Sequence, residues 1–447
     1  MVTARDIATV VDDRRARASV SAMELTTALL ERIAEHNAAL GAVWEVFAES
    51  AIADAVEVDR ARATGQRLPL DGLPMVLKDN IDVGGHKTSL GAGAEIAVYP
   101  ERDATAVAAL RRAGAVFLGK AAMHALAFGA TSDNEHFGPV RNPWSLDRMA
   151  GGSSGGSAAA IAADLSIAAL GTDTGGSIRI PAALCGVVGL RPTFGSVPTA
   201  GLHATSWSLD TIGPLARSAI DVGDVLAALT GHPASAGSRG VRGIRVGVAK
   251  GTLFEDVDPS IADAVREALE IFQNAGARLV SVDFEGAETA RAFCSAVLHV
   301  EALAEYEIRL VEHPTAFGEA VRRRLEFARS IPAIAYARAL RWRADWARVV
   351  DASFDRADVI VTPTVPLVAP LIIGTEMIST TASLTRLTYP WSFARVPAMS
   401  IPCGFSDRLP VGLQLVARSG DDHLLLALAA AYQSETDYHR RRPPMQT

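Results

Sequence analysis

Two turns rich in glycine and serine hold the residues best suited to chemistry. The first turn covers residues 151–157 and the second covers residues 171–177, with an apolar, alanine-rich run between them. Glycine adopts positive φ values and lets the backbone approach a ligand closely, so the turns predict backbone N–H groups gathered around one point. A flexible linker of this composition would not be interrupted by a segment that favours burial. The hydroxyls of Ser153, Ser154 and Ser177 are therefore candidates for a nucleophile and a proton carrier.

Three kinds of chemistry use glycine-rich turns of this sort. Residues 151–155 match the G-x-S-x-G nucleophile elbow, but that elbow directly follows an apolar strand, and residues 141–149 are too polar to form one of any length. Neither turn contains the lysine of a Walker A loop or the G-x-G-x-x-G pattern of a dinucleotide site. The third kind is a serine nucleophile that is activated through a lysine instead of a histidine.

Lys78 is the lysine best placed to be such a base. It follows the apolar residues 73–77, which predict a buried strand, and open α/β sheets bind their ligands at the carboxyl ends of strands. A lysine with its usual pKa of about 10.4 is a poor base, but burial lowers the pKa of a lysine. The ten histidines lie in unlike contexts and offer no obvious alternative.

Three longer motifs carry a resemblance to a known family. They read LPMVLKDNID, GGSSGGSAAA and GTDTGGSIRIPAALCGVVGLRPT, and they begin near residues 73, 151 and 171. With the spacing from Lys78 to Ser153 and on to Ser177, they resemble the amidase signature family of Ser–cis-Ser–Lys amidohydrolases. Weaker likeness extends over nearly the whole chain except roughly residues 230–355. Within the family, the chain is most similar to bacterial amidases of aryl-acetamides, such as indoleacetamide and mandelamide hydrolases.

The resemblance implies a role for each residue that matches the motifs. Ser177 is expected to be the nucleophile, Ser153 the bridging serine after a cis peptide bond, and Lys78 the general base. Neutral Lys78 would take a proton from Ser153, which would take one from Ser177. The backbone N–H groups expected to form the oxyanion hole are those of Thr174, Gly175, Gly176 and Ser177.

Residues around these motifs are expected to support the site or bind the substrate. Ser154 and Asp173 would brace the two turns through hydrogen bonds to backbone groups, and Arg179 is either a structural ion-pair partner, the favoured role, or a contact to an anionic substrate group. Side chains that could line an apolar acyl pocket, or equally belong to the core, are Phe128, His136, Phe137 and Trp207. The chain departs from the common family pattern at Ala125, Ser392, Ala394 and Arg395. These departures leave the substrate open.

The resemblance therefore implies an amidohydrolase that cleaves the C–N bond of a small carboxylic amide. The reaction would pass through a serine acyl-enzyme and release ammonia or an amine, with an aryl-acetamide as one candidate substrate. Two alternatives stay open, namely the glutaminase component of a tRNA-dependent amidotransferase and a hydrolase of hydrazides, carbamates or substituted amides. Such a triad requires no metal and no cofactor.

The composition of the 447 residues is typical of a soluble globular protein, with 49% hydrophobic and 21% charged residues. The net charge of −7 comes from mixed signs without a basic stripe, which argues against nucleic acid as a partner. No signal peptide and no apolar run of about 20 residues is visible, so we expect a cytoplasmic protein without a membrane partner. Three widely spaced cysteines indicate a reducing compartment. The expected ligand is a small-molecule amide, and a homodimer is a conceivable assembly.

The order of hydrophobic patterns predicts an α/β fold. We expect one amidase domain over residues 1–447, with a mixed, largely parallel β-sheet covered by helices on both faces and a signature core at about 70–220. Residues 287–358 predict a helical insertion or cap, broken around Pro314 and Pro332. The other expected helices cover residues 21–36, 103–113, 259–275 and 421–435, and the expected strands include 244–249, 278–284, 358–362 and a hairpin of 398–402 with 411–417.

Overall fold

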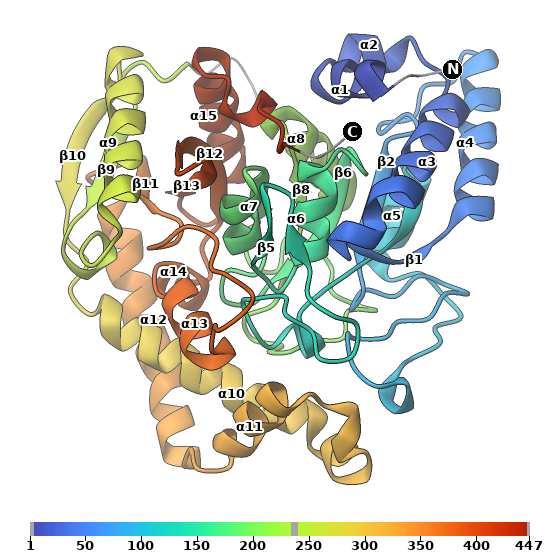
Figure 1. The fold of residues 1–447 in the computed structure, drawn as a ribbon. Coiled ribbons are helices and arrows are strands. Elements are labelled where there is room, and N and C mark those ends of the chain that lie inside the picture. The colour runs from blue at the N-terminus through green and yellow to red at the C-terminus, as the bar shows by residue number, and fades with distance from the viewer. Residues whose placement is uncertain (1–3, 234–239, 445–447) are drawn as a thin grey trace.

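One mixed sheet of eleven strands runs through the computed structural model, which describes residues 4–233 and 240–444 (Figure 1). From one edge to the other the strands are β1 (Val43–Val46), β3 (Val116–Ala121), β2 (Pro74–Lys78), β6 (Ala168–Asp173), β8 (Thr211–Ala216), β7 (Val188–Arg191), β12 (Ala398–Ser406), β13 (Leu409–Val416), β11 (Val359–Pro363), β9 (Arg245–Ala249) and β10 (Arg278–Val282). A separate small sheet pairs β4 (Arg141–Asn142) with β5 (Ser145–Met149). The predicted α/β class and the mixed sheet are confirmed.

Parallel pairing lies in the two flanks of the sheet. Strands β3, β2 and β6 are parallel on one side, and β11, β9 and β10 are parallel on the other. The pairs from β6 through β8, β7, β12 and β13 to β11 are antiparallel, as is β1 with β3. The predicted hairpin of β12 and β13 turns at Asp407 and Arg408, both with positive φ, and so short a turn permits only antiparallel pairing.

Helices cover the sheet on both faces (Figure 1). The helices of the first 233 residues are α1 (Ala4–Asp12), α2 (Arg14–Ala18), α3 (Ala22–Leu40), α4 (Ala48–Ala63), α5 (Thr105–Arg112), α6 (Gly155–Ala162), α7 (Arg179–Cys185) and α8 (Ala219–Thr230). Helix α3 begins as predicted, because Ser21 Oγ accepts the backbone N–H of Glu24 at 3.0 Å, and it continues beyond the predicted end to Leu40. Within the described residues, no helix is both long and apolar enough to cross a bilayer.

A second group of helices comes from the later part of the chain and is drawn in yellow to red in Figure 1. Its members are α9 (Pro259–Asn274), α10 (Ala287–Glu312), α11 (Glu319–Ala328), α12 (Ala333–Ser353), α13 (Met377–Leu384), α14 (Tyr389–Ala394) and α15 (Asp422–Glu435). The breaks predicted around Pro314 and Pro332 separate α10, α11 and α12. Helix α10 contacts α11, α12 and α14, and these helices share a hydrophobic core that includes Trp346 and Trp391.

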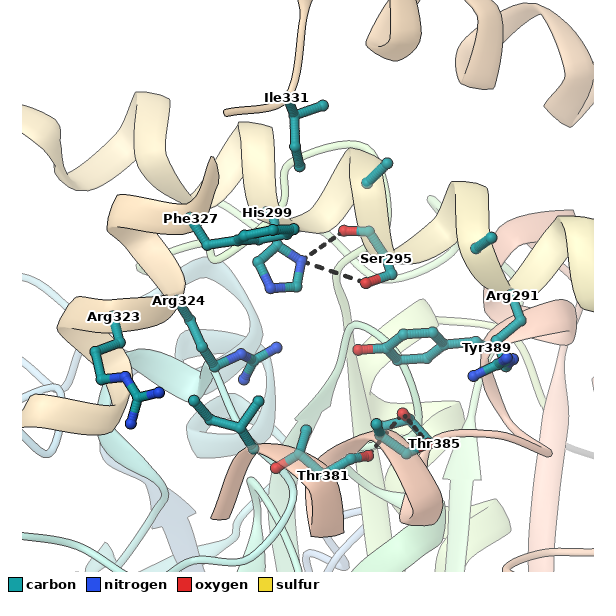
Figure 2. Close-up of a pocket in the computed structure, with 14 residues that line it drawn as sticks. Arg291, Ser295, His299, Arg323, Arg324, Phe327, Ile331, Thr381, Thr385 and Tyr389 are labelled. Carbon is teal, nitrogen blue, oxygen red and sulfur yellow. Dashed lines mark hydrogen bonds between the residues drawn. The ribbon is translucent and has the colours of Figure 1, made fainter. Parts of the chain in front are cut away.

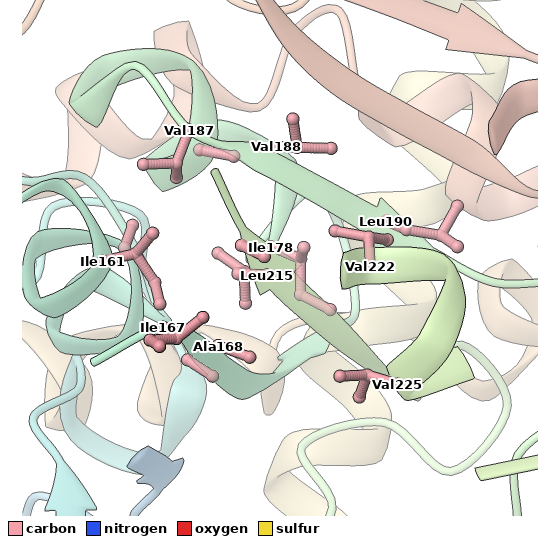
Figure 3. Close-up of a cluster of buried hydrophobic side chains, with 14 of the residues drawn as sticks. Ile161, Ile167, Ala168, Ile178, Val187, Val188, Leu190, Leu215, Val222 and Val225 are labelled. Atoms are coloured by element: carbon pink, nitrogen blue, oxygen red, sulfur yellow. The ribbon is translucent and has the colours of Figure 1, made fainter. Parts of the chain in front are cut away.

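The main core lies between α6, the central strands and α8 (Figure 3). Ile161 of α6, Leu215 of β8 and Val222 of α8 are fully buried there. The alanine-rich run between the two turns forms α6, and its small side chains let the helix approach the sheet closely. At Gly156 a Cβ atom would collide with the carbonyl oxygens of Ala42 and Ala122, so the composition of the first turn is also a packing requirement.

Candidate active site

Lys78 ends strand β2 with its side chain fully buried. Its Nζ lies 2.7 Å from Ser153 Oγ and 2.6 Å from Thr172 Oγ1. Burial lowers the pKa of Lys78 to about 7, although the negative charges of Asp210 and Asp173 oppose this effect. A substantial fraction of the amine is therefore neutral near pH 7 and able to accept a proton from Ser153.

The first turn presents Ser153 to Lys78 through a cis peptide bond between Gly152 and Ser153. The Ser153 carbonyl accepts the backbone N–H of His124 at 3.1 Å. In the next residue, Ser154 Oγ accepts the N–H of Thr172 and donates to the Thr172 carbonyl, both at 3.2 Å. These bonds fix the first turn against the end of β6 and hold Ser153 beside the lysine.

The second turn places Ser177 next to the first. The Ser154 N–H donates to the Ser177 carbonyl at 3.0 Å, which joins the two turns directly. Ser177 is 7% exposed, and it lines a small cavity together with Thr174 and Gly175. Gly175 packs against the ring of Tyr389 so tightly that a Cβ atom there would collide with the ring. The side chain of Ser177 is thus buried and still borders space for a substrate.

Asp173 changes the expected set of oxyanion donors. Its Oδ1 accepts the N–H of Gly176 at 2.8 Å, and its Oδ2 accepts the N–H of Ile178 at 3.3 Å. The N–H of Gly176 is therefore committed to a carboxylate and unavailable to a developing oxyanion, contrary to the expectation from the sequence. The backbone N–H groups of Thr174, Gly175 and Ser177 stay candidates.

Arg179 is fully buried and bound by protein groups alone. Its guanidinium donates to both carboxylate oxygens of Asp173 at 2.9 Å, to Gln414 Oε1 at 2.7 Å and to Ser392 Oγ at 2.7 Å. Burial alone would raise the pKa of Asp173, but Arg179 and the neighbouring Arg191 hold that pKa well below its usual range. These contacts correspond to the favoured structural role of Arg179, and Ser392 is one of the positions that departs from the family pattern.

A larger cavity of about 640 Å³ opens beside the small one (Figure 2). The two cavities share Arg324, Thr381, Thr385 and Tyr389, so they form a continuous path from Ser177. The walls of the larger cavity come from α10, α11, α13 and α14. A substrate with its amide at Ser177 would extend its acyl group toward these helices.

Arg324 of α11 lies between the two cavities. Its guanidinium donates to the Phe128 carbonyl, and its carbon Cζ is 4.0 Å from the centre of the Phe128 ring. It also interacts with the Tyr389 hydroxyl. No Asp or Glu in residues 4–233 or 240–444 forms an ion pair with it, although it is only 7% exposed. The site therefore contains a buried positive charge without an acidic counter-ion.

The four aromatic residues proposed for the acyl pocket have different positions. Phe128 lies behind Arg324 and supports it. Phe137 is 41% exposed and stacks on Trp44 at 4.2 Å, Trp207 is 52% exposed, and His136 is exposed as well. None of these last three lines either cavity. The structure does not bring them to the site, because they lie at the protein surface.

Sequence reasoning missed the residues that do line the larger cavity, above all Arg324 and His299. A signal for Arg324 was present, because Val321, Arg324 and Ala328 share one helix face and all three are buried. A charged residue in a buried helical stripe is unusual and indicates a special role. No comparable pattern marks His299, which lies on a helix of mixed character.

Comparisons with known proteins agree with this geometry. The family model described as Amidase matches residues 24–426. The glutaminase-type component of glutamyl-tRNA(Gln) amidotransferase known as its A subunit, from Roseiflexus castenholzii, is 38% identical over 467 aligned residues, which cover 96% of this chain and 95% of that protein. The native peptide amidase from Stenotrophomonas maltophilia superposes with a TM-score of 0.85 at 31% identity and 98% coverage of both chains. The corresponding amidotransferase chain from Thermotoga maritima gives a TM-score of 0.81 at 30% identity, covering 99% of this chain and 98% of that one.

Proposed function

Because the chain belongs to the amidase family, we propose that it hydrolyses the C–N bond of a small carboxylic amide through an acyl-enzyme on Ser177. One observation carries the proposal, namely the 2.7 Å contact between the buried Lys78 Nζ and Ser153 Oγ, next to the turn that holds Ser177 at the cavity. A lysine with a pKa of about 7 in this position is suited to act as a base.

The proposed reaction begins with proton transfer. Neutral Lys78 accepts the proton of Ser153, Ser153 accepts the proton of Ser177, and Ser177 Oγ attacks the amide carbon. Backbone N–H groups of the second turn donate to the oxyanion of the tetrahedral intermediate. The proton then returns through Ser153 to the leaving nitrogen, the C–N bond breaks, and the amine or ammonia departs. Water attacks the acyl-enzyme in the same way and releases the carboxylic acid.

The larger cavity supports an acyl group of moderate size. Its volume of about 640 Å³ and the apolar side chains of Phe327, Ile331 and Ile378 suit an aromatic or branched aliphatic group. Aryl-acetamides remain one candidate class on these grounds.

A second candidate is the glutaminase component of a tRNA-dependent amidotransferase. Sequence similarity supports it more strongly than an aryl-acetamide amidase, because the relatives of highest similarity carry that name. The cavity charges support it less. Free glutamine carries an ammonium as well as a carboxylate, and Arg324 could bind the carboxylate. Neither described cavity presents an Asp or Glu to the ammonium.

Ammonia release by the purified protein separates the two candidates. The panel contains acetamide, phenylacetamide, indole-3-acetamide, mandelamide and glutamine, with the Ser177→Ala variant as the blank. Turnover of an aryl amide by the isolated chain supports the first candidate. Release from glutamine only when partner proteins and tRNA are added supports the second. No release under either condition would overturn both, and hydrazides, carbamates and substituted amides would then be tested.

A further inference from the structure

His299 of α10 projects into the larger cavity with one ring nitrogen already occupied (Figure 2). Its Nδ1 lies 2.7 Å from the backbone carbonyl oxygen of Ser295, one helical turn earlier. A carbonyl oxygen only accepts hydrogen bonds, so Nδ1 must carry the hydrogen and donate it. In the neutral ring this leaves Nε2 without a hydrogen and able to accept one hydrogen bond.

The surroundings of the ring keep it neutral. His299 is 8% exposed, and its ring makes edge contacts with Phe128 at 5.1 Å and with Phe327 at 5.7 Å. Burial, together with the positive charge of Arg324, lowers the pKa of His299 to about 3. Near neutral pH the ring is therefore a fixed tautomer with its acceptor nitrogen unprotonated.

Nε2 has no partner in the described part of the chain. The hydrogen bonds of the ring run from Nδ1 to Ser295, to its carbonyl oxygen and at 3.4 Å to its hydroxyl. A buried acceptor without a partner costs about 1–3 kcal/mol, so its presence at the wall of a cavity points to a ligand that supplies a donor.

We propose that His299 Nε2 determines substrate specificity by accepting a hydrogen bond from a hydroxyl or N–H group on the acyl part of the amide. The inference rests on the proposed function, because it places the amide at Ser177 and the acyl group in the larger cavity. Phe327 and Ile331 supply apolar surface on the same side. The substrate class is therefore an amide whose aromatic or aliphatic acyl group carries one hydrogen-bond donor away from the scissile bond.

The test compares phenylacetamide with its 3-hydroxy and 4-hydroxy derivatives. We expect the wild-type protein to prefer one hydroxylated amide by about tenfold or more in kcat/KM, because a site built for a donor rejects the analogue that lacks it. The His299→Phe variant keeps an aromatic ring without the acceptor, and this ratio should fall toward one. The His299→Gln variant, which offers an amide oxygen, should restore part of it. A ratio near one in the wild type, or an unchanged ratio in His299→Phe, would overturn the inference.

Ser295→Ala is the matched control for the tautomer. It removes the distant hydroxyl and keeps the carbonyl that accepts from Nδ1, so the wild-type ratio should persist. A second readout separates this inference from the proposed function. In ¹⁵N-histidine spectra of the Ser177→Ala variant, the His299 Nε2 signal should shift on titration with a hydroxylated amide and not with phenylacetamide. If the wild type releases no ammonia from any amide, the proposed function fails, and this titration alone decides the inference. The absence of a shift would then overturn it.

Discussion

The two glycine-rich turns and the helical wall of the larger cavity differ in how they are built. The turns consist of small residues, and residues 150–183 are buried without exception. Their geometry comes from backbone hydrogen bonds, such as that from Ser154 to Ser177, and from packing that leaves no space for a Cβ at Gly175. The cavity wall instead consists of long side chains from four helices, and some of them, such as Phe327, are largely exposed.

This difference separates chemistry from selectivity. A change in the turns alters atoms that must lie within hydrogen-bond reach of one another, so its effects should be large and general for every substrate. A change in the wall alters which acyl group fits and leaves the reacting atoms in place. Its effects should be graded and dependent on the substrate.

The largest effect is expected from Ser177→Ala. If Ser177 is the nucleophile, the substitution removes the atom that forms the acyl-enzyme, and kcat should fall by about 10⁴-fold or more. Ammonia release and the reaction of the protein with a fluorophosphonate probe measure the loss. The exposed Ser434 of α15 provides the control, because Ser434→Ala changes a hydroxyl far from the turns. Substantial turnover by folded Ser177→Ala protein would remove Ser177 from the role of nucleophile.

A loss nearly as large is expected from Lys78→Met, which replaces the amine by an apolar chain of similar length. In the wild type, kcat/KM should rise with pH through the pKa of Lys78, about 7, because only the neutral amine accepts a proton. Below that pKa the fall should approach about tenfold per pH unit. The profile is measured between about pH 6 and 9. Lys250→Met, at an exposed position, should keep the wild-type profile. A flat profile for the wild type would contradict the role of Lys78.

Arg179→Ala tests whether the second turn depends on its buried ion pair. The substitution leaves Asp173 as an uncompensated buried charge, so the free energy of unfolding should fall by about 3–5 kcal/mol. Chemical denaturation measures this change. The pair of Arg348 with Asp345 offers the contrast, because its side chains are 78% and 52% exposed. Arg348→Ala should have little effect. Equal stability losses in the two variants would show that burial of the pair is not what matters.

The same contrast explains how far the sequence alone could predict the molecule. The turns are local, and their glycines, serines and strand-end lysine are visible within three short motifs, so Lys78, Ser153 and Ser177 could be proposed together. The cavity wall is assembled from residues as distant as His299 and Tyr389, whose helices meet only in the folded chain. Hydrophobicity indicated that Phe137 and Trp207 favour contact with apolar groups but not where they lie. Likewise, the antiparallel centre of the sheet depends on connections that strand propensity does not specify.

Phe327→Ala should have the smallest effect and defines the other limit of the comparison. The side chain is 59% exposed, so its removal should change the free energy of unfolding by no more than about 0.5 kcal/mol. It lines the larger cavity, and loss of its apolar surface should raise KM for aryl amides by about tenfold or less, with kcat nearly unchanged. Acetamide, which is too small to reach α11 from Ser177, should show no change. Ile334→Ala is the matched control, because Ile334 is 60% exposed on α12 and does not line the cavity. A fall in kcat with both substrates would mean that the wall also positions the reacting atoms, and the separation of chemistry from selectivity would not hold.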